Sequence, residues 1–316
     1  MKKAAFQMDP PARLNVASDT TLMLAEEAQK RGYDCYHYTP ADLSWHQGEL
    51  LATLRPMSVD TTHDQFCELG EAALMPLAEC EMVWMRQDPP FDLAYITATH
   101  MLEHLPKSTR VFNDPKGVRE SPEKLSPLFF NAFMPPTLIS RDLAAINAFA
   151  QEHRTIIAKP LFGFGGRGVF KLKADDPNLA TLLEYWGEQN REPLMWQAFL
   201  PEVEKEDRRI LLIDGEMTAV FGRLPEEGSI RANMRLGGKP VAASLTRQQE
   251  KICAALAPYL KAHGLLLAGV DVIGDYLTEI NVTSPTGLRA AEKLYGTNLA
   301  RHVWDKVEGT RALGTQ

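Results

Sequence analysis

The chain has 316 residues, of which 45% are hydrophobic and 24% are charged, a balance typical of a globular protein with a large core. Its formal net charge of −7 argues against broad nucleic-acid binding, and no apolar run approaches the roughly 20 residues of a membrane helix. The four cysteines are scattered without a C-x-x-C pair, which favours free thiols in a reducing cytoplasm over a zinc site or a disulfide framework.

The first 120 residues alternate short apolar runs with helical patterns. A helix is expected from the N-cap signal Ser18-Asp19-Thr20 to Lys30, and another over residues 92–105. Strands are expected at residues 4–8, 35–38, 81–86 and 110–113. Alternation of this kind predicts a parallel α/β unit, whose ligands lie beyond the carboxyl ends of the strands. Asp9 and Arg86-Gln87-Asp88 fall at those ends.

The remainder of the chain predicts a mixed α+β unit. Helices are expected at residues 123–133, 141–152, 177–186 and 246–263, where Pro258 should kink or end the last one. Strands are expected at residues 137–140, 155–159, 169–173, 195–199, 209–213 and 218–223. Residues 224–239 are rich in glycine and lack periodicity, which indicates a mobile loop.

The stretch from Gly269 to Gly287 predicts two short strands that carry two acids and a carboxamide. Glu279 and Asn281 are two residues apart, so on a strand they share a face. Asp271 joins them if pairing across the hairpin sets it opposite Glu279, which requires an odd-numbered loop such as residues 274–276. Oxygen ligands of this kind suit a hard divalent cation such as Mg²⁺. The competing interpretation is a surface hairpin with acidic decoration.

A glycine-rich stretch follows an apolar strand that ends at Lys159. Gly163, Gly165, Gly166 and Gly168 allow backbone N–H groups to turn inward around an anion. The dinucleotide fingerprint is rejected because a strand rather than a helix follows, and no Lys-Ser/Thr pair closes a P-loop. The pattern favours a lid over a triphosphate, with a ligand-free hairpin as the alternative. Lys124 and Lys159 are the candidate phosphate cations.

Two arginines flank a pair of predicted strands. Arg209 opens the first strand and Arg223 closes the second, so both could face one anionic pocket. Solvated surface positions are favoured for Arg208 and Arg235. No Ser-His-Asp, Cys-His or His-x-x-x-His arrangement is found, which argues against nucleophilic catalysis and a zinc site.

Three strings resemble the bacterial glutathione synthetases of the ATP-grasp superfamily: Met85 to Asp92 (MRQDPPFD), Glu123-Lys124-Leu125, and Glu279 to Thr286 (EINVTSPT). The similarity runs essentially from end to end. It implies an N-terminal pre-ATP-grasp domain at residues 1–120 and an ATP-grasp domain at residues 121–316. Within the second domain it implies a lid subdomain at about 121–200 and a catalytic subdomain at about 201–316 with a flexible loop at 224–239.

The resemblance implies that γ-glutamylcysteine, glycine and ATP give glutathione, ADP and phosphate through an acylphosphate. Asp271, Glu279 and Asn281 would hold Mg²⁺, with Mn²⁺ as the other ion considered. The residues implied to bind ATP are Lys124, Lys159, Gly165, Gly166, Gln197, Leu200 and Asp207. Those implied to stabilise the acylphosphate are Arg209, Arg223 and Arg231, and those implied to bind the dipeptide are Arg86, Asp88, Ser284 and Thr286.

Some positions depart from the family pattern. Gln87 stands where lysine is usual, Pro122 replaces an asparagine, Lys239 replaces an arginine, and Phe162 and Phe164 replace Asp and Met. These departures bear on the dipeptide or acceptor preference, not on the ATP chemistry. Two alternatives stay open: another ATP-grasp ligase, such as one joining D-alanines or adding glutamates, and a non-catalytic ATP-binding protein. The resemblance also implies a homo-oligomer with small-molecule substrates.

Overall fold

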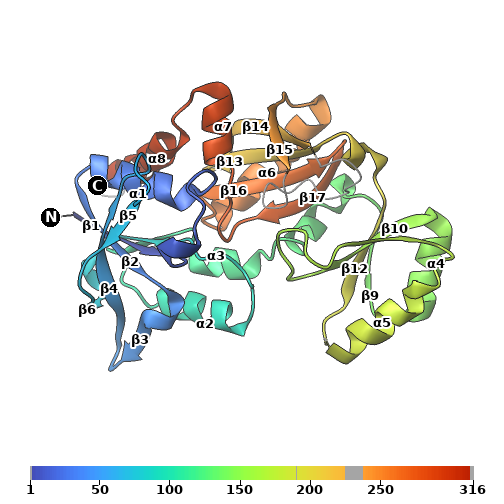
Figure 1. The fold of residues 1–316 in the computed structure, drawn as a ribbon, viewed down its shortest axis with the longest axis horizontal. Coiled ribbons are helices and arrows are strands. Elements are labelled where there is room, and N and C mark those ends of the chain that lie inside the picture. The colour runs from blue at the N-terminus through green and yellow to red at the C-terminus, as the bar shows by residue number, and fades with distance from the viewer. Residues whose placement is uncertain (1, 190, 225–237, 314–316) are drawn as a thin grey trace.

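The structure, a computed structural model, describes residues 2–189, 191–224 and 238–313. Figure 1 shows three sheets: an N-terminal sheet, a central sheet beside it, and a smaller one that stands apart with α4 and α5. Among the described helices, none combines the length and the apolar character needed to cross a membrane.

The N-terminal sheet has a parallel centre, as expected. Its strands lie in the order β2-β1-β7-β8, and every pair in this series is parallel. Asp19 caps α1 by accepting a hydrogen bond from Leu22 N, which confirms the expected N-cap. The elements are β1 (Lys2–Gln7), α1 (Thr20–Lys30), β2 (Tyr33–Tyr38), β7 (Met82–Met85), α2 (Leu93–Leu102), β8 (Arg110–Phe112) and α3 (Pro115–Glu120).

An antiparallel extension of this sheet was not expected from the sequence. Strand β4 pairs with β2, β3, β5 and β6, all antiparallel, so the sheet is mixed rather than wholly parallel. The bounds of the added strands are β3 (Leu43–His46), β4 (Glu49–Val59), β5 (Cys67–Leu69) and β6 (Ala73–Pro76).

The smaller sheet has the order β11-β10-β12-β9, with antiparallel pairs throughout. The helix expected over residues 123–133 is instead a 3₁₀ segment, Ser126–Phe133, interrupted by non-helical backbone at Phe130. The other elements of this part are β9 (Thr137–Ser140), α4 (Leu143–His153), β10 (Thr155–Pro160), β11 (Phe170–Lys173), α5 (Asn178–Gln189) and β12 (Leu194–Ala198).

The central sheet carries the predicted acidic hairpin at its edge, in the order β15-β14-β13-β16-β17. Pro258 lies inside α6, which continues to Ala262, so the helix does not end at the proline, and a kink there stays a prediction. Two C-terminal helices had not been expected. The elements are β13 (Asp207–Ile213), β14 (Glu216–Leu224), β15 (Lys239–Ala242), α6 (Arg247–Ala262), β16 (Leu267–Ile273), β17 (Tyr276–Asn281), α7 (Leu288–Tyr295) and α8 (Leu299–Leu313).

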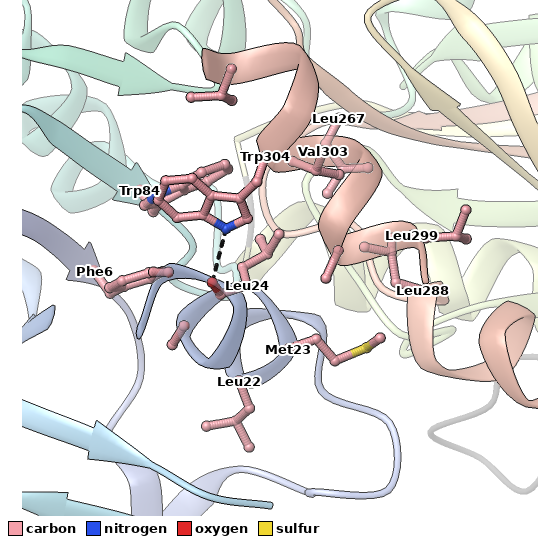
Figure 2. Packing of buried hydrophobic residues seen from close by; sticks show 14 of the residues in the cluster. Phe6, Leu22, Met23, Leu24, Trp84, Leu267, Leu288, Leu299, Val303 and Trp304 are labelled. Carbon is pink, nitrogen blue, oxygen red and sulfur yellow. Dashed lines mark hydrogen bonds between the residues drawn. The ribbon is translucent and has the colours of Figure 1, made fainter. Parts of the chain in front are cut away.

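One buried cluster joins the two ends of the chain. Figure 2 shows Trp304 of α8 beside Leu24 of α1 and Trp84 of β7, and the indole Nε1 of Trp304 donates a hydrogen bond of 2.9 Å to Leu24 O. The same cluster takes in Leu211 of β13 and Leu267 of β16. The smaller sheet has a separate cluster around Ile146, Ile156 and Trp196. The N-terminal and central sheets therefore share a core that the smaller sheet does not enter.

Candidate active site

The acidic hairpin pairs as the sequence argument required, but for a different reason. Asp271 lies opposite Glu279, and Gly269 opposite Asn281. The loop between the strands contains only Gly274 and Asp275, so the expected three-residue loop is wrong. A β-bulge restores the register, because Thr278 is an extra residue between the Val272–Leu277 and Asp271–Glu279 pairs. The hydroxyl of Thr278 donates to Asp271 O at 3.0 Å.

A row of charged side chains crosses the central sheet. Arg209 is the register partner of Asp271, which in turn faces Glu279. Arg209 Nε lies 2.6 Å from Asp271 Oδ1, and Arg223 Nη2 lies 3.1 Å from the same oxygen. A Cβ at position 269 would collide with the Arg209 guanidinium, so glycine leaves the space that this side chain occupies.

Burial and the two arginines together set the pKa values of the neighbouring acids. Burial acts to raise the pKa of Asp271, but Arg209 and Arg223 hold that pKa below its ordinary value. Asp207, 2.6 Å from Arg223 Nη2, has its pKa raised to about 6 because burial outweighs the attraction of the arginine. The guanidinium of Arg223 is thus shared between two carboxylates.

The donor set of the hairpin fits a hard cation. Asp271 and Glu279 supply carboxylate oxygens. Asn281 Nδ2 donates to Gly269 O at 3.1 Å and to Asp271 Oδ2 at 3.2 Å, so its Oδ1 remains as an acceptor. Within the described part of the chain, no group of three or more His, Cys, Asp or Glu side chains could hold a metal. A site here therefore depends on the Asn281 carboxamide as its third protein oxygen.

A cavity lies between the smaller sheet and the central sheet. Ile157 and Lys159 are two residues apart on β10 and line it from one face, and Gln197 of β12 pairs with Ile157. Burial lowers the pKa of Lys159, although the negative charge of Glu279 opposes this shift. The predicted residues that line the cavity are Lys124, Lys159, Gly165, Gly166, Gln197, Leu200, Asp207, Asp271 and Glu279.

The glycine-rich stretch joins β10 to β11 as a strand–loop–strand, which confirms the rejection of a dinucleotide fingerprint. Gly165 and Gly166 have φ angles of 62° and 73°, a left-handed conformation that favours glycine. Lys124 Nζ donates to Gly163 O and lies 3.7 Å from Glu279 Oε1, so it links the loop to the hairpin.

A second cavity adjoins the first. Both cavities are lined by Gly165, Arg167 and Glu279. Asp88 and Ser284 line the second one, where the Ser284 hydroxyl donates to Asp88 Oδ1 at 2.5 Å. Its other predicted lining residues are Thr286, Arg209, Arg223 and Asn281.

Some predicted residues do not reach these cavities. Arg86 is buried, donates to Thr21 Oγ1 and Pro285 O, and lies behind the wall rather than in it. Gln87 is also buried, and Gln7 Nε2 donates to its Oε1 at 2.7 Å. Arg231, and most of the predicted loop at 224–239, lie outside the described residues.

The sequence argument assigned no ligand-binding role to several residues of the second cavity. They are Arg13, Asp19, Glu123 and Arg167. Glu123 is the most informative of these. It directly precedes Lys124, a predicted ATP-binding residue that lines the first cavity, yet Glu123 itself lines the second cavity. Its position next to Lys124, in a string already singled out, was the only signal available.

Comparison with solved structures defines the fold. The chain is similar to a Chryseobacterium gregarium RiPP-associated ATP-grasp ligase, with a TM-score of 0.65, 15% identity and 98% and 97% of the two chains covered. It is also similar to D-cycloserine synthetase DcsG, with a TM-score of 0.64, 17% identity and coverage of 95% and 99%. These neighbours place the fold in the ATP-grasp class.

Comparison of sequences identifies a particular family within this class. Family models match residues 2–119 to the prokaryotic glutathione synthetase N-terminal domain and residues 123–296 to the prokaryotic glutathione synthetase ATP-grasp domain. Glutathione synthetase of Brucella melitensis is 47% identical over 98% of this chain and 99% of that protein, and that of Agrobacterium fabrum is 45% identical over 98% of each. The chain belongs to the prokaryotic glutathione synthetase family, whose members are ATP-grasp ligases that use ATP and a divalent metal.

Proposed function

We propose that this chain joins the cysteinyl carboxylate of γ-glutamylcysteine to the amine of glycine, with ATP converted to ADP and phosphate. The observation that carries this proposal is the junction of the two cavities at Gly165, Arg167 and Glu279. A triphosphate in the first cavity would end where a carboxylate in the second begins. Phosphoryl transfer to a carboxylate needs this positioning and no protein nucleophile.

The first cavity is the proposed ATP site. Lys124, Lys159, Gly165 and Gly166 would contact the phosphates, while Gln197 and Leu200 would meet adenine and Asp207 the ribose. Support comes from the placement of all seven residues along one cavity. The left-handed backbone of Gly165 and Gly166 supports their role, because it is compatible with N–H groups that converge on an anion.

Asp271, Glu279 and Asn281 are the proposed ligands of Mg²⁺, with Mn²⁺ as the alternative ion. The cation, when bound, neutralises charge on the transferred phosphoryl group. Asp271 forms ion pairs with Arg209 and Arg223, so a cation held by this carboxylate would lie beside both guanidiniums.

Arg209 and Arg223 are proposed catalytic residues. Arg231 is proposed as a third, and it lies outside the residues that the structure describes. The carboxylate oxygen of the dipeptide attacks the γ-phosphorus and ADP leaves. The neutral glycine nitrogen then attacks the carbonyl carbon, the C–O bond to phosphate breaks, and the departing phosphate takes up the proton that the nitrogen loses. Arg209 and Arg223 line the second cavity and would stabilise the charge that develops on the acylphosphate.

Asp88, Ser284 and Thr286 are the proposed contacts of the dipeptide, because they line the second cavity. Arg86 would act on the same wall through Pro285, whose carbonyl accepts its hydrogen bond. The division into residues 1–120 and 121–316, with subdomains near 121–200 and 201–316, also stays a proposal. So do a cytoplasmic location, a homo-oligomeric state, and the absence of nucleic-acid and membrane partners.

Phosphate release with γ-glutamylcysteine, in the presence and absence of glycine, tests the function. We expect glycine-dependent release of ADP and phosphate with glutathione as the product. D-Alanine and glutamate serve as competing acceptors, so faster turnover with either would assign another ligase activity. ATP binding without turnover on any substrate would contradict catalysis.

A further inference from the structure

Two successive residues of the chain face different cavities. Lys124 lines the nucleotide cavity, where its Nζ contacts the glycine loop, and Glu123 lines the second cavity. The backbone fixes this division, because Glu123 O accepts a hydrogen bond of 3.0 Å from Ile280 N on β17. Glu123 is therefore held alongside the Glu279–Asn281 segment.

The carboxylate of Glu123 is oriented but not neutralised. Its Oε1 accepts a hydrogen bond of 2.7 Å from the hydroxyl of Thr283, a residue that is only 3% exposed. Within the described residues, Oε2 makes no hydrogen bond and the carboxylate forms no ion pair. Burial raises the pKa of Glu123, while Lys124 and Thr283 act against this shift. Burying a carboxylate without a contacting cation lowers the stability of the fold, and a positively charged ligand would remove that cost.

Apart from Glu279, which is a proposed metal ligand, the other acids of the second cavity belong to a different wall. Asp9 accepts a hydrogen bond from Asp88 N, and Asp19 caps α1 through Leu22 N. Asp88 accepts from Ser284. Asp9, Asp19 and Asp88 come from the loops after the N-terminal strands, whereas Glu123 lies against the strand that carries the proposed metal ligands.

We propose that Glu123 binds the ammonium group of the acceptor amino acid through Oε2 and so helps to select a charged amine as the acceptor, whose nitrogen releases one proton to water before it attacks. This inference rests on the proposed function, since it places the acceptor nitrogen beside the carbonyl carbon of the acylphosphate. Thr283 is the positioning residue, because its hydroxyl holds Oε1 and thereby directs Oε2 to the cavity. An amino acid offers the ammonium that the carboxylate lacks.

Glu123→Gln tests the contact. We expect the kcat/KM for glycine to fall about 10- to 100-fold, as for loss of a charge-assisted hydrogen bond, mainly through KM. The KM for ATP should stay within about twofold. Glu120→Gln is the matched control, since Glu120 is exposed on α3 and pairs with Lys116 at 3.8 Å. It should leave all constants unchanged.

Hydroxylamine separates acceptor binding from acylphosphate formation, because it is a largely uncharged amine at neutral pH. We expect Glu123→Gln to form the hydroxamate from γ-glutamylcysteine at the wild-type rate. An equal loss with hydroxylamine and with glycine would overturn the proposal, and so would a glycine KM within twofold of wild type. Absence of hydroxamate in the wild-type protein would instead count against the proposed function itself.

Thr283→Val provides a second route if Glu123→Gln does not fold. It retains the carboxylate and removes the hydroxyl that orients it, so we expect the glycine KM to rise about threefold while hydroxylamine turnover is retained. An unchanged glycine KM in this variant, with Glu123→Gln unfolded, would overturn the proposal.

Discussion

Asp271 is the residue on which the charge balance of the candidate site depends. It pairs with two buried guanidiniums, of Arg209 and Arg223, and is a proposed metal ligand. Asp271→Asn removes the shared counter-charge. We expect turnover to fall about 10²-fold or more, as for loss of a transition-state contact. We also expect the free energy of unfolding to fall by about 3–5 kcal/mol, because buried charges lose their partner.

ADP release and urea unfolding measure the two effects of Asp271→Asn separately. Asp275→Asn is the matched control, since Asp275 occupies the two-residue loop of the same hairpin. It should leave both quantities near the wild-type values. Near-normal turnover in Asp271→Asn would contradict the metal assignment.

His37 gives a prediction about pH. It lies on β2, is only 5% exposed, and burial lowers its pKa below the ordinary value. Below about pH 6.5 the unfolded chain takes up a proton that the folded chain resists, so the unfolded state binds more protons and stability falls as pH falls. We expect His37→Gln to reduce the loss of unfolding free energy between about pH 7.5 and 5.5, measured by urea denaturation.

The matched control for His37 is His46→Gln, at an exposed position on β3. Each variant is compared with wild type at both pH values. An identical pH dependence in His37→Gln and wild type would show that His37 does not contribute to acid destabilisation.

At the scale of elements, the acidic hairpin shows what the sequence could and could not predict. Side-chain alternation placed both strands and the Asp271–Glu279 pair correctly. It could not reveal the bulge at Thr278, because an extra residue leaves no mark on composition and the threonine is itself a good strand former. The register was right, but its cause was a bulge rather than an odd loop.

Other misses have physical reasons of the same kind. Strands β3, β5 and β6 are short and partly exposed, so they lack a strong alternating pattern. Strand β4 is 11 residues long, and its buried residues alternate, so its pattern was available in the sequence but was not used. Helix α6 continues past Pro258 to Ala262, because a proline in a helix can bend it without ending it. The pairing of Asp271 with Arg209 joins residues 62 positions apart, and no local pattern predicts such a contact. The positions of Lys159 on β10 and of the glycines in the loop after it were predictable, because strand and loop are contiguous in the sequence.

The glycine loop provides the prediction for an element. Gly166 has a φ of 73°, which costs a residue with a Cβ roughly 1–2 kcal/mol. Gly166→Ala should therefore distort the loop or disfavour its binding conformation. We expect the KM for ATP to rise about tenfold, with little change in the KM for the dipeptide, both measured from ADP release.

Gly309→Ala is the control for Gly166→Ala. Gly309 lies within α8, and an added Cβ there would meet no heavy atom within 4 Å. We expect unchanged KM values and a slight gain in stability from better helix propensity. Equal KM values for ATP in Gly166→Ala and wild type would argue against contact between this loop and the phosphates.

At the scale of the whole molecule, the chain has two kinds of core. The cluster around Trp304, Leu24 and Trp84 ties the last helix to the first strands and reaches Leu211 and Leu267. The smaller sheet closes over its own cluster. The glycine loop belongs to the separate part, and its Gly165 and Arg167 also line the second cavity, whose other lining residues come mainly from the shared part.

This arrangement predicts that a substitution in one core destabilises the strands packed on that core and leaves the strands of the other core unchanged. Trp304→Ala should cost about 3–5 kcal/mol and speed amide hydrogen exchange in both β1 and β13, but not in β10. Ile146→Ala, at a fully buried position of α4, should speed exchange in β10 and spare β1 and β13. Tyr185→Ala, at a position 63% exposed on α5, is the surface control. Exchange by mass spectrometry at matched temperature distinguishes these patterns. Equal acceleration of all three strands in both core variants would mean that the molecule opens as a single unit.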